Sequence, residues 1–282
     1  MTKSYYGVNE KNFNADRNRN SPIDPVNKPI MNEQITSTPD PVVCGIKHAM
    51  AISTYLGEKM FDRCEIIKES ITSLLESGYP GIIHVVDDCS KMKDHLNFIG
   101  ELNEHRVKVY VQEQNGGLSK VKNRGIKQIL EGGSDFGFLA DDDVHYEKGW
   151  WNMYLEAYEK TGIPHFCCTA SNCGHIAVVN GFNIRNVGVH QGSVITFSKK
   201  MIDEMGYYKV LPCKLGHEHT QWTNKAVHRK ITPFIADTVN SHEFLRYIGN
   251  SCSTRPADFY IQASTNLSFI CKELDINEKC II

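Results

Sequence analysis

The sequence lacks any uninterrupted run of about 18 apolar residues, the length that a membrane-spanning helix needs. Its first residues, MTKSYYGVNEKNFN, also lack the apolar core of a secretory signal. The first absence excludes a transmembrane helix and a membrane partner. The second predicts a cytoplasmic protein.

The chain also lacks a large excess of charge of either sign. The 282 residues carry a formal net charge of −2, so the chain as a whole has no electrostatic pull toward nucleic acid or anionic lipid. Ten cysteines are present, but none forms a Cys-x-x-Cys pair, and Cys167, Cys168 and Cys173 lack the spacing of a zinc site. We therefore expect reduced thiols that pack as small hydrophobic side chains.

Hydrophobic residues make up 41% of the chain, enough for one large core or two fused halves. Residues 1–41 stand apart, because they hold seven Asn and five of the ten Pro and show no helical or strand periodicity. Such a segment is expected to be an extended or disordered N-terminal arm. It could be mobile, or it could lie as a strap on the domain or on a neighbouring subunit.

Apolar strands and amphipathic helices alternate along the next hundred or so residues. Val42 to Ile46 is the first expected strand, and apolar positions between Glu58 and Ser77 mark one face of a helix. Further strands are predicted at 82–86, 107–111 and 136–140, separated by helices at 90–104, capped by Ser90, and at 118–130. This alternation favours the α/β class, with a doubly wound, mostly parallel sheet.

Acidic residues follow two of these strands. Asp87 and Asp88 end the second strand, and Asp141, Asp142 and Asp143 end the fourth. Ligands of open α/β sheets lie at the carboxyl ends of the strands, so these acids arrive where a ligand would lie. Alternation along an extended segment puts Asp141 and Asp143 on one side, and such an oxygen pair suits Mg²⁺ or Mn²⁺ shared with substrate phosphates. The alternative is a solvated acidic turn.

Several short motifs occur in a fixed order around these acids. They are Ser73-Leu74-Leu75 with Gly78-Tyr79-Pro80, then Val85-Val86-Asp87-Asp88-Cys89-Ser90, then Asn115-Gly116-Gly117-Leu118-Ser119 with Lys122-Asn123-Arg124-Gly125-Ile126, and finally Phe138-Leu139-Ala140-Asp141-Asp142-Asp143 with Gly149-Trp150. Together they resemble the nucleotide-binding half of a GT-A glycosyltransferase, most closely the family 2 enzymes. The resemblance implies a GT-A fold with a Rossmann-like sheet.

The resemblance also implies roles for individual residues. Asp87 and Asp88 would hold the uracil or ribose, and Arg124 would help to bind the nucleotide. In the acidic triplet, Asp141 would meet the ribose, Asp142 would belong to the same donor site, and Asp143 would bind the metal ion. One departure concerns the loop after the first strand, where family 2 usually has Pro-Thr-Tyr-Asn and this chain reads Gly45-Ile46-Lys47-His48-Ala49.

The second half contains a candidate base. Gly192 to Lys199, followed by Met205 to Tyr208, resembles the link that leads to a Gly-x-Glu-Asp motif in families 2 and 7. Here the motif reads Gly216-His217-Glu218-His219, so His219 stands where the family usually has the catalytic Asp. An inverting transfer needs a base within hydrogen-bond reach of the acceptor hydroxyl, and either Glu218 or His219 could serve. The alternative is a pair of surface histidines beside a helix N-terminus.

His242 follows the apolar segment that begins at Ile235. Several GT-A enzymes complete the metal shell with a histidine from this region, so the resemblance makes His242 a candidate metal ligand. Imidazole beside carboxylate suits Mn²⁺ better than Mg²⁺. A structural histidine is the alternative.

These inferences imply a metal-dependent, inverting glycosyltransferase that uses a UDP-sugar. Residues 42–150 would bind the nucleotide sugar, residues 151–245 would bind the acceptor and supply the base, and residues 246–282 would pack on the domain as a tail. A nucleotidyltransferase is disfavoured, because Gly45-Ile46-Lys47-His48 is a poor phosphate cradle. A non-catalytic protein that binds nucleotide sugars or glycans is a further alternative.

Two classes of acceptor are considered, and hydroxymethylcytosine in bacteriophage DNA is the preferred one. The bias toward Asn, Ile and Lys is typical of AT-rich genomes, and a compact chain without an anchor resembles bacteriophage enzymes that glycosylate hydroxymethylcytosine in DNA. A bacterial glycan is the alternative. A DNA acceptor would need local basic patches to neutralise phosphates. The candidates are Lys199-Lys200, Lys209, Lys214, Lys225 and His228-Arg229-Lys230. No oligomeric state is predicted.

Overall fold

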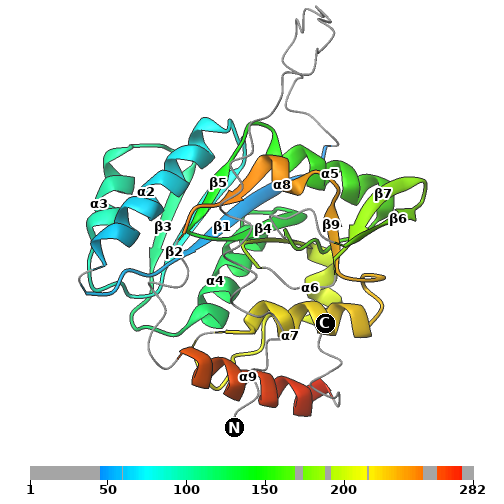
Figure 1. Cartoon of the computed structure of the whole chain (residues 1–282). Coiled ribbons are helices and arrows are strands. Elements are labelled where there is room, and N and C mark those ends of the chain that lie inside the picture. The colour runs from blue at the N-terminus through cyan, green and yellow to red at the C-terminus, as the bar shows by residue number, and fades with distance from the viewer. Residues whose placement is uncertain are drawn as a thin grey trace, which may run out of the picture. The chain divides into compact units, whose positions relative to one another are not determined.

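A five-stranded sheet with the order β3-β2-β1-β4-β8 forms the centre of the fold (Figure 1). The computed structural model describes residues 45–58, 60–168, 174–187, 192–214, 216–249 and 259–274, and the predicted arm at 1–41 lies outside them. The strands of the sheet are β1 (His48–Thr54), β2 (Ile82–Asp87), β3 (Val107–Val111), β4 (Phe136–Asp141) and β8 (Val194–Ser198).

The strand pairing defines a ligand edge. β1 pairs in parallel with β2 on one side and with β4 on the other, β2 pairs in parallel with β3, and β8 runs antiparallel to β4. The chain thus builds outward from β1 to β3 and then returns to place β4 beside β1. The mostly parallel α/β sheet predicted from the sequence is confirmed. Its strand order reverses between β1 and β4, and ligands bind at the carboxyl ends of strands at such a point.

Helices cover both faces of this sheet, so its central strands β1 and β4 bury apolar residues on both sides. Met50, Ile52 and Phe138 face one core, whereas Ala51 and Leu139 face the other, as the two-residue period of a strand requires. The helices of the first core are α2 (Phe61–Glu76), α3 (Asp94–Glu101) and α5 (Trp150–Thr161), and those of the second are α4 (Leu118–Glu131), α6 (Lys199–Met205) and α7 (Glu218–His228).

α4 approaches the sheet closely enough to exclude a side chain. A Cβ atom on Gly125 would lie 2.6 Å from the Cβ atom of Ala51 in β1. Glycine at this position therefore lets the helix rest directly on the strand. Lys122 precedes Gly125 by three residues and so lies on the same face of α4, toward the sheet.

Smaller elements extend the second half of the chain. They are a sheet of β6 (His175–Val179), β7 (Phe182–Asn186) and β9 (Ala236–Thr238), a ribbon of β5 (Val144–Tyr146) and β10 (Leu245–Tyr247), and the helices α8 (Ser241–Phe244) and α9 (Phe259–Leu274). The buried Asn266 side chain of α9 accepts from Cys213 N at 2.9 Å and donates to Gly216 O at 2.9 Å, so α9 holds the loop that leads into α7. Within the described residues, no helix has the length and apolarity to cross a lipid bilayer.

The first strand begins later than the sequence pattern indicated. Of the expected strand, Val42 to Ile46, only residues 45 and 46 lie within the described residues, and neither is in a strand; the described chain enters the sheet at His48. β1 reads His-Ala-Met-Ala-Ile-Ser-Thr, which has few β-branched residues, and its burial between β2 and β4 outweighs that weak propensity. The loop after β1 therefore starts at Tyr55, and the departure noted at Gly45-Ile46-Lys47-His48-Ala49 lies before that loop.

The second predicted helix is also displaced. α3 begins at Asp94 rather than after Ser90, and its N-cap residue is Lys93. The Ser90 hydroxyl instead accepts from Leu56 N at 2.7 Å and contacts Asp87. Ser90 therefore joins the loop after β1 to the end of β2 and does not cap a helix.

Candidate active site

The acidic triplet lies at the end of β4, at the ligand edge of the sheet. Asp141 is the last residue of β4 and pairs with Ser53 of β1, while Asp142 and Asp143 form the turn into β5. Asp142 is 2% exposed and Asp143 is 5% exposed. A solvated acidic turn is therefore excluded, and the charge of these carboxylates has to be balanced inside the protein.

Arg63 supplies part of that balance. It lies in the first turn of α2, and its guanidinium donates to Asp142 through Nη2 and to Asp143 Oδ2 through Nη1 at 3.3 Å. One cation thus holds two adjacent carboxylates. Burial still raises the pKa of Asp142 to about 7, because the Asp143 and Asp141 charges add to the effect of burial while Arg63 opposes it.

Lys122 supplies the second balancing charge. Its ammonium is 3.2 Å from Asp141 Oδ1 and 3.3 Å from Glu218 Oε1, and its side chain is fully buried. Burial alone would lower the pKa of Lys122, but the two carboxylates outweigh burial and raise it above its ordinary value. Lys122 therefore joins the end of β4 to the start of α7, although these segments are far apart in the sequence.

Glu218 and His219 form a carboxylate–imidazole pair at the N-terminus of α7. His219 Nδ1 lies 3.2 Å from Glu218 Oε1, the oxygen that Lys122 also contacts. Burial would raise the pKa of Glu218, but Lys122 and His219 outweigh burial and hold it far below its usual range. His219 is packed in place by Gly192, where a Cβ atom would lie 2.7 Å from its ring. Glu218 is thus a weak base that is well placed to orient His219.

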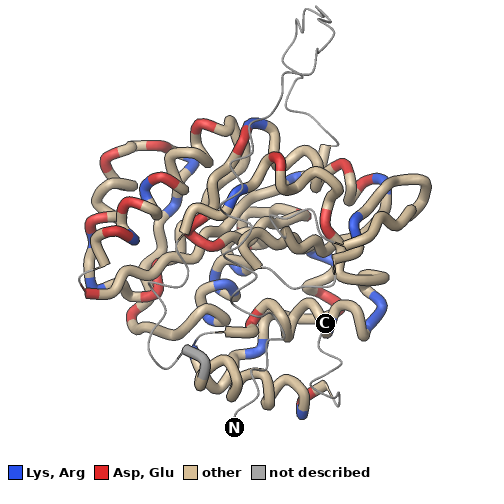
Figure 2. The backbone as a smooth tube through the Cα atoms, viewed as in Figure 1, with Lys and Arg blue, Asp and Glu red and all other residues tan. Residues whose placement is uncertain are grey.

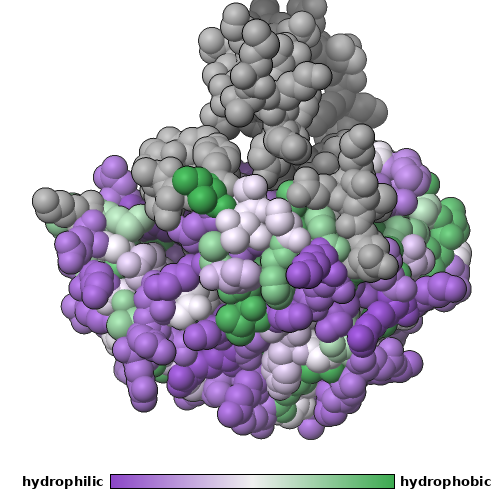
Figure 3. All heavy atoms as spheres, turned by 90° about the horizontal axis from the view of Figure 1, so that it is seen from below, coloured by the Kyte–Doolittle hydropathy of each residue, from purple (hydrophilic) through white to green (hydrophobic). Residues whose placement is uncertain are grey.

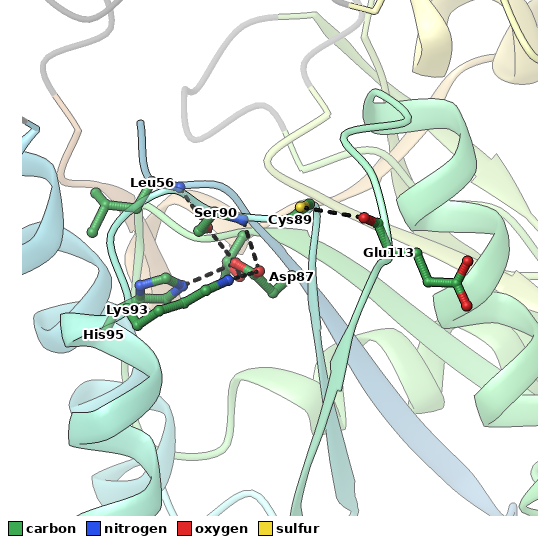
Figure 4. A network of polar contacts seen from close by, with 8 residues as sticks. Leu56, Asp87, Cys89, Ser90, Lys93, His95 and Glu113 are labelled. Carbon is green, nitrogen blue, oxygen red and sulfur yellow. Dashed lines mark hydrogen bonds and ion pairs between the residues drawn. The ribbon is translucent and has the colours of Figure 1, made fainter. Parts of the chain in front are cut away.

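Asp87 is fully engaged inside the protein (Figure 4). Its carboxylate contacts the Ser90 hydroxyl and accepts from Ser90 N at 2.9 Å, from His95 Nε2 at 3.1 Å and from Lys93 Nζ at 3.5 Å. Burial would raise the pKa of Asp87, but the His95 and Ser90 hydrogen bonds outweigh it and lower the pKa to about 2. Asp87 therefore fixes the loop after β2 as an anion.

Asp88 fixes a second loop. Its two carboxylate oxygens accept from Gly116 N at 2.7 Å and from Gly117 N at 2.8 Å, at the turn that begins α4. Gly117 has a φ of 81°, and a Cβ atom there would lie 2.8 Å from the Cα atom of Lys214. Asp88 thus holds the start of α4, and with it Lys122, against the ligand edge.

Arg124 lies on a different face of α4 from Lys122. Its guanidinium lies over the Tyr110 ring, 5.6 Å from the centroid, and it lines a surface cavity of about 450 Å³ with Asn123, Lys127, Gln128 and Tyr207. The basic residue of α4 that contacts the acids is Lys122, for which no role was expected. Lys122 shares the apolar face of α4 with Val121, Ile126 and Ile129, and this spacing was the signal for a buried, paired lysine.

His242 is not brought to the acidic triplet. β10 runs antiparallel to β5, with Phe244 O accepting from Glu147 N and Ile248 N donating to Asp143 O. Residue 248 therefore lies beside Asp143, and residue 242 lies beyond the opposite end of the strand pair. The histidine follows the β9 strand as expected, but the ribbon carries it away from the carboxylates.

The carboxylates fit a divalent ion that is shared with a ligand. When Asp141, Asp142, Asp143 and Glu218 are all ionised, Arg63 and Lys122 leave two negative charges unbalanced. Asp142 Oδ2 and Asp143 Oδ1 are buried without a hydrogen-bond partner. Among the described residues, no three His, Cys, Asp or Glu side chains form a complete cage. Such a partial oxygen shell suits Mg²⁺ or Mn²⁺, whose remaining ligands are waters and phosphate oxygens.

The Lys122 contacts predict a large effect on stability. Lys122→Met should lower the free energy of unfolding by about 3–5 kcal/mol, because two carboxylates lose their buried partner. Urea denaturation would measure the loss. Lys120→Met is the matched control, since Lys120 lies on the same helix and is exposed. Equal stability of the two variants would show that the Lys122 pairs contribute nothing.

The sequence matches a known family over most of the sheet. The family model named Glycosyl transferase family 2 matches residues 59–211. An uncharacterized glycosyltransferase of Acanthamoeba polyphaga mimivirus is 34% identical over 209 residues, which cover 71% of this chain and 81% of that protein.

Solved structures share the fold. S. aureus TarS superposes with a TM-score of 0.57 at 19% identity, over 84% of this chain and 41% of TarS. TarS 1-349 in complex with UDP-GlcNAc gives a TM-score of 0.54 at 19% identity, over 84% of this chain and 69% of that one. The structure of GalNAc-T7 with UDP, GalNAc and Mn²⁺ gives a TM-score of 0.59 at 12% identity, over 82% of this chain and 48% of that one. The chain thus spans less than half of the complete TarS chain, and at these identities the likeness concerns the fold, which is the predicted GT-A fold.

Proposed function

Because the chain belongs to glycosyltransferase family 2 and is a transferase, we propose that it moves a sugar from a UDP-sugar to a hydroxyl group of a glycan. The observation that carries this proposal is the double contact of Lys122. One buried ammonium joins Asp141, at the strand end where a nucleotide sugar would bind, to Glu218, which starts α7 beside His219. A donor site and a candidate base are thereby parts of one site.

His219 is the proposed base. Its Nδ1 faces the Glu218 carboxylate, so the tautomer with a proton on Nδ1 is favoured and Nε2 is left to take the proton of the acceptor hydroxyl. Glu218 is less suited to that role, because the nearby Lys122 and His219 keep its pKa low. Deprotonation of the acceptor as it attacks the face opposite the leaving diphosphate would invert the anomeric carbon.

The acids of β4 are the proposed donor site. Asp143 and Asp142 each carry a buried carboxylate oxygen without a hydrogen-bond partner, and Asp143 is the proposed metal ligand, with Mn²⁺ or Mg²⁺ as the ion. A divalent ion bound there would neutralise the charge that grows on the leaving diphosphate. Asp141 would meet the ribose, while Asp87 and Asp88 would shape the loops around the nucleotide. The UDP in the TarS and GalNAc-T7 structures supports a uridine donor.

A glycan is preferred over DNA because three of the candidate basic side chains are paired with acidic residues and a fourth is bound to a backbone carbonyl. Lys199 pairs with Asp203 at 2.8 Å, Lys200 with Glu204 at 3.8 Å and Lys209 with Glu273 at 3.2 Å. The Lys225 ammonium donates to Met205 O at 2.9 Å. Figure 2 shows basic and acidic residues interspersed along the chain. In Figure 3 the described side chains seen from below are mainly hydrophilic, with separated apolar patches.

A transfer assay tests the proposal and separates the two acceptors. The protein would be incubated with Mn²⁺ and a panel of UDP-sugars, with free oligosaccharides in one series and hydroxymethylcytosine DNA beside unmodified DNA in the other. Mass spectrometry would then detect a sugar adduct. We expect an adduct on an oligosaccharide. An adduct on hydroxymethylcytosine DNA would replace the glycan proposal with the DNA one. UDP binding without transfer to any acceptor in the panel would contradict both.

A further inference from the structure

Arg63 lies against the carboxylates that would bind a divalent ion. Its side chain is 17% exposed, and its two terminal nitrogens contact Asp142 and Asp143, one each. The Asp142 charge raises the pKa of the guanidinium above its already high value, so Arg63 stays charged at every relevant pH. The protein therefore carries a fixed cation beside its candidate metal site.

The surroundings of Asp143 restrict where an ion can bind. Oδ2 faces Arg63, and a Cβ atom on Gly249 would lie 2.7 Å from the same oxygen. Oδ1 is buried without a hydrogen-bond partner. An ion on Oδ1 would lie on the same carboxylate as the guanidinium, and two positive charges this close in a buried site repel each other.

We propose that Arg63 is a positioning residue that occupies the acids in the donor-free protein and moves to the donor diphosphate when a divalent ion binds. A guanidinium displaced from a carboxylate needs another anion, and its planar set of donors matches phosphate oxygens as well as carboxylate oxygens. The incoming diphosphate is the anion that arrives with the ion. Arg63 thereby makes each ligand favour the binding of the other.

This exchange predicts a measurable coupling. In the absence of UDP, Arg63 competes with Mn²⁺ for Asp142 and Asp143, so the affinity for Mn²⁺ is low. UDP removes the competitor and raises that affinity, and by reciprocity Mn²⁺ raises the affinity for UDP by the same factor. The inference rests on the proposed function for its donor, whereas the competition between Arg63 and Mn²⁺ does not.

Mn²⁺ binding without UDP tests the competition directly. Electron paramagnetic resonance of free Mn²⁺ would give the affinity of the wild type, Arg63→Gln and Arg63→Lys. We expect Arg63→Gln to bind Mn²⁺ about tenfold more tightly than the wild type, to bind UDP more weakly, and to lose most of the coupling. Arg63→Lys keeps the charge without the two-pronged contact and should fall between them. Lys68→Gln removes a charge from the same helix away from the acids and should change nothing.

The possible outcomes separate this inference from the proposed function. Weaker or unchanged Mn²⁺ binding in Arg63→Gln would overturn the exchange and leave Arg63 as a structural partner of the acids. If circular dichroism shows that Arg63→Gln does not fold, the same result in Arg63→Lys would overturn it. Failure of the wild type to bind either Mn²⁺ or UDP would instead contradict the proposed function. Wild-type binding of both ligands, with tighter Mn²⁺ binding in both variants, would support the exchange.

Discussion

Replacing His219 with alanine should lower the turnover number roughly 10²–10⁴-fold, the usual contribution of a general base, and should leave the affinity for UDP near that of the wild type. The reason is geometric. Glu218 Oε1 holds His219 Nδ1 at 3.2 Å, and the ring rests against Gly192, so the imidazole is fixed by contacts that a substrate does not have to supply. Steady-state kinetics with a fixed acceptor would measure the loss.

Two further variants make this result specific. His228→Ala changes an exposed histidine at the other end of α7 and should keep turnover within about twofold of the wild type, as expected for a surface change. Glu218→Gln should cost less than His219→Ala, because the amide oxygen can still accept from His219 Nδ1. A large loss in Glu218→Gln with little loss in His219→Ala would exchange the two roles. Full activity in both Glu218→Gln and His219→Ala would show that α7 does not supply the catalytic base.

Replacing Asp143 with asparagine should reduce transfer by about 10³-fold or more, because several kcal/mol of charge stabilisation at the diphosphate would be lost. Asp143 carries a buried carboxylate oxygen without a hydrogen-bond partner, and a cation bound to this oxygen would satisfy it. The same variant should weaken UDP binding in the presence of Mn²⁺. Calorimetric titration of UDP, with and without Mn²⁺, would measure this effect beside the transfer rate.

Asp142→Asn is the matched control for that variant. It makes the same chemical change one residue earlier, in the carboxylate that Arg63 Nη2 contacts. We expect transfer to decline less than in Asp143→Asn. Equal activity of the wild type and Asp143→Asn at saturating Mn²⁺ would show that the end of β4 does not bind the catalytic ion.

The sheet could be predicted where apolar runs are long and bounded by turns. β3, α4 and β4 appear within one residue of their expected ends, because each carries a clear period or a buried run next to glycine or acid residues. β1 could not be placed, since its alanine, methionine and serine residues have weak strand propensity. Only the neighbouring strands β2 and β4 show that this segment lies in the middle of the sheet.

The candidate site also contains residues that could be predicted from the sequence and residues that could not. The strand-end pattern led to Asp141, Asp142 and Asp143, and the family resemblance led to Glu218 and His219. The fold brings these five residues together around two cations. Neither cation was expected. Lys122 differs from Arg124 by about half a helical turn, and such a difference is decided by which face of α4 packs on the sheet. Arg63 lies in α2, which is far from the acidic triplet in the sequence, so no local sequence pattern predicts this contact.

The placement of His242 depended on strand direction. The sequence indicates a strand before this histidine, but not that the segment after it forms β10 and pairs antiparallel with β5. That pairing decides which end of the ribbon lies beside Asp143. Residue types can therefore suggest candidate metal ligands, whereas the pairing of the strands decides which candidates lie close together.

The most direct test of a transferase site at the end of β4 is the formation of UDP from UDP-sugars. UDP would be quantified over time for a panel of donors with the wild type, Asp143→Asn and His219→Ala, each with Mn²⁺ and with a chelator. The account predicts UDP from at least one donor with the wild type and Mn²⁺, and almost none with the chelator or with either variant. UDP formation at wild-type rates in Asp143→Asn and His219→Ala would contradict it.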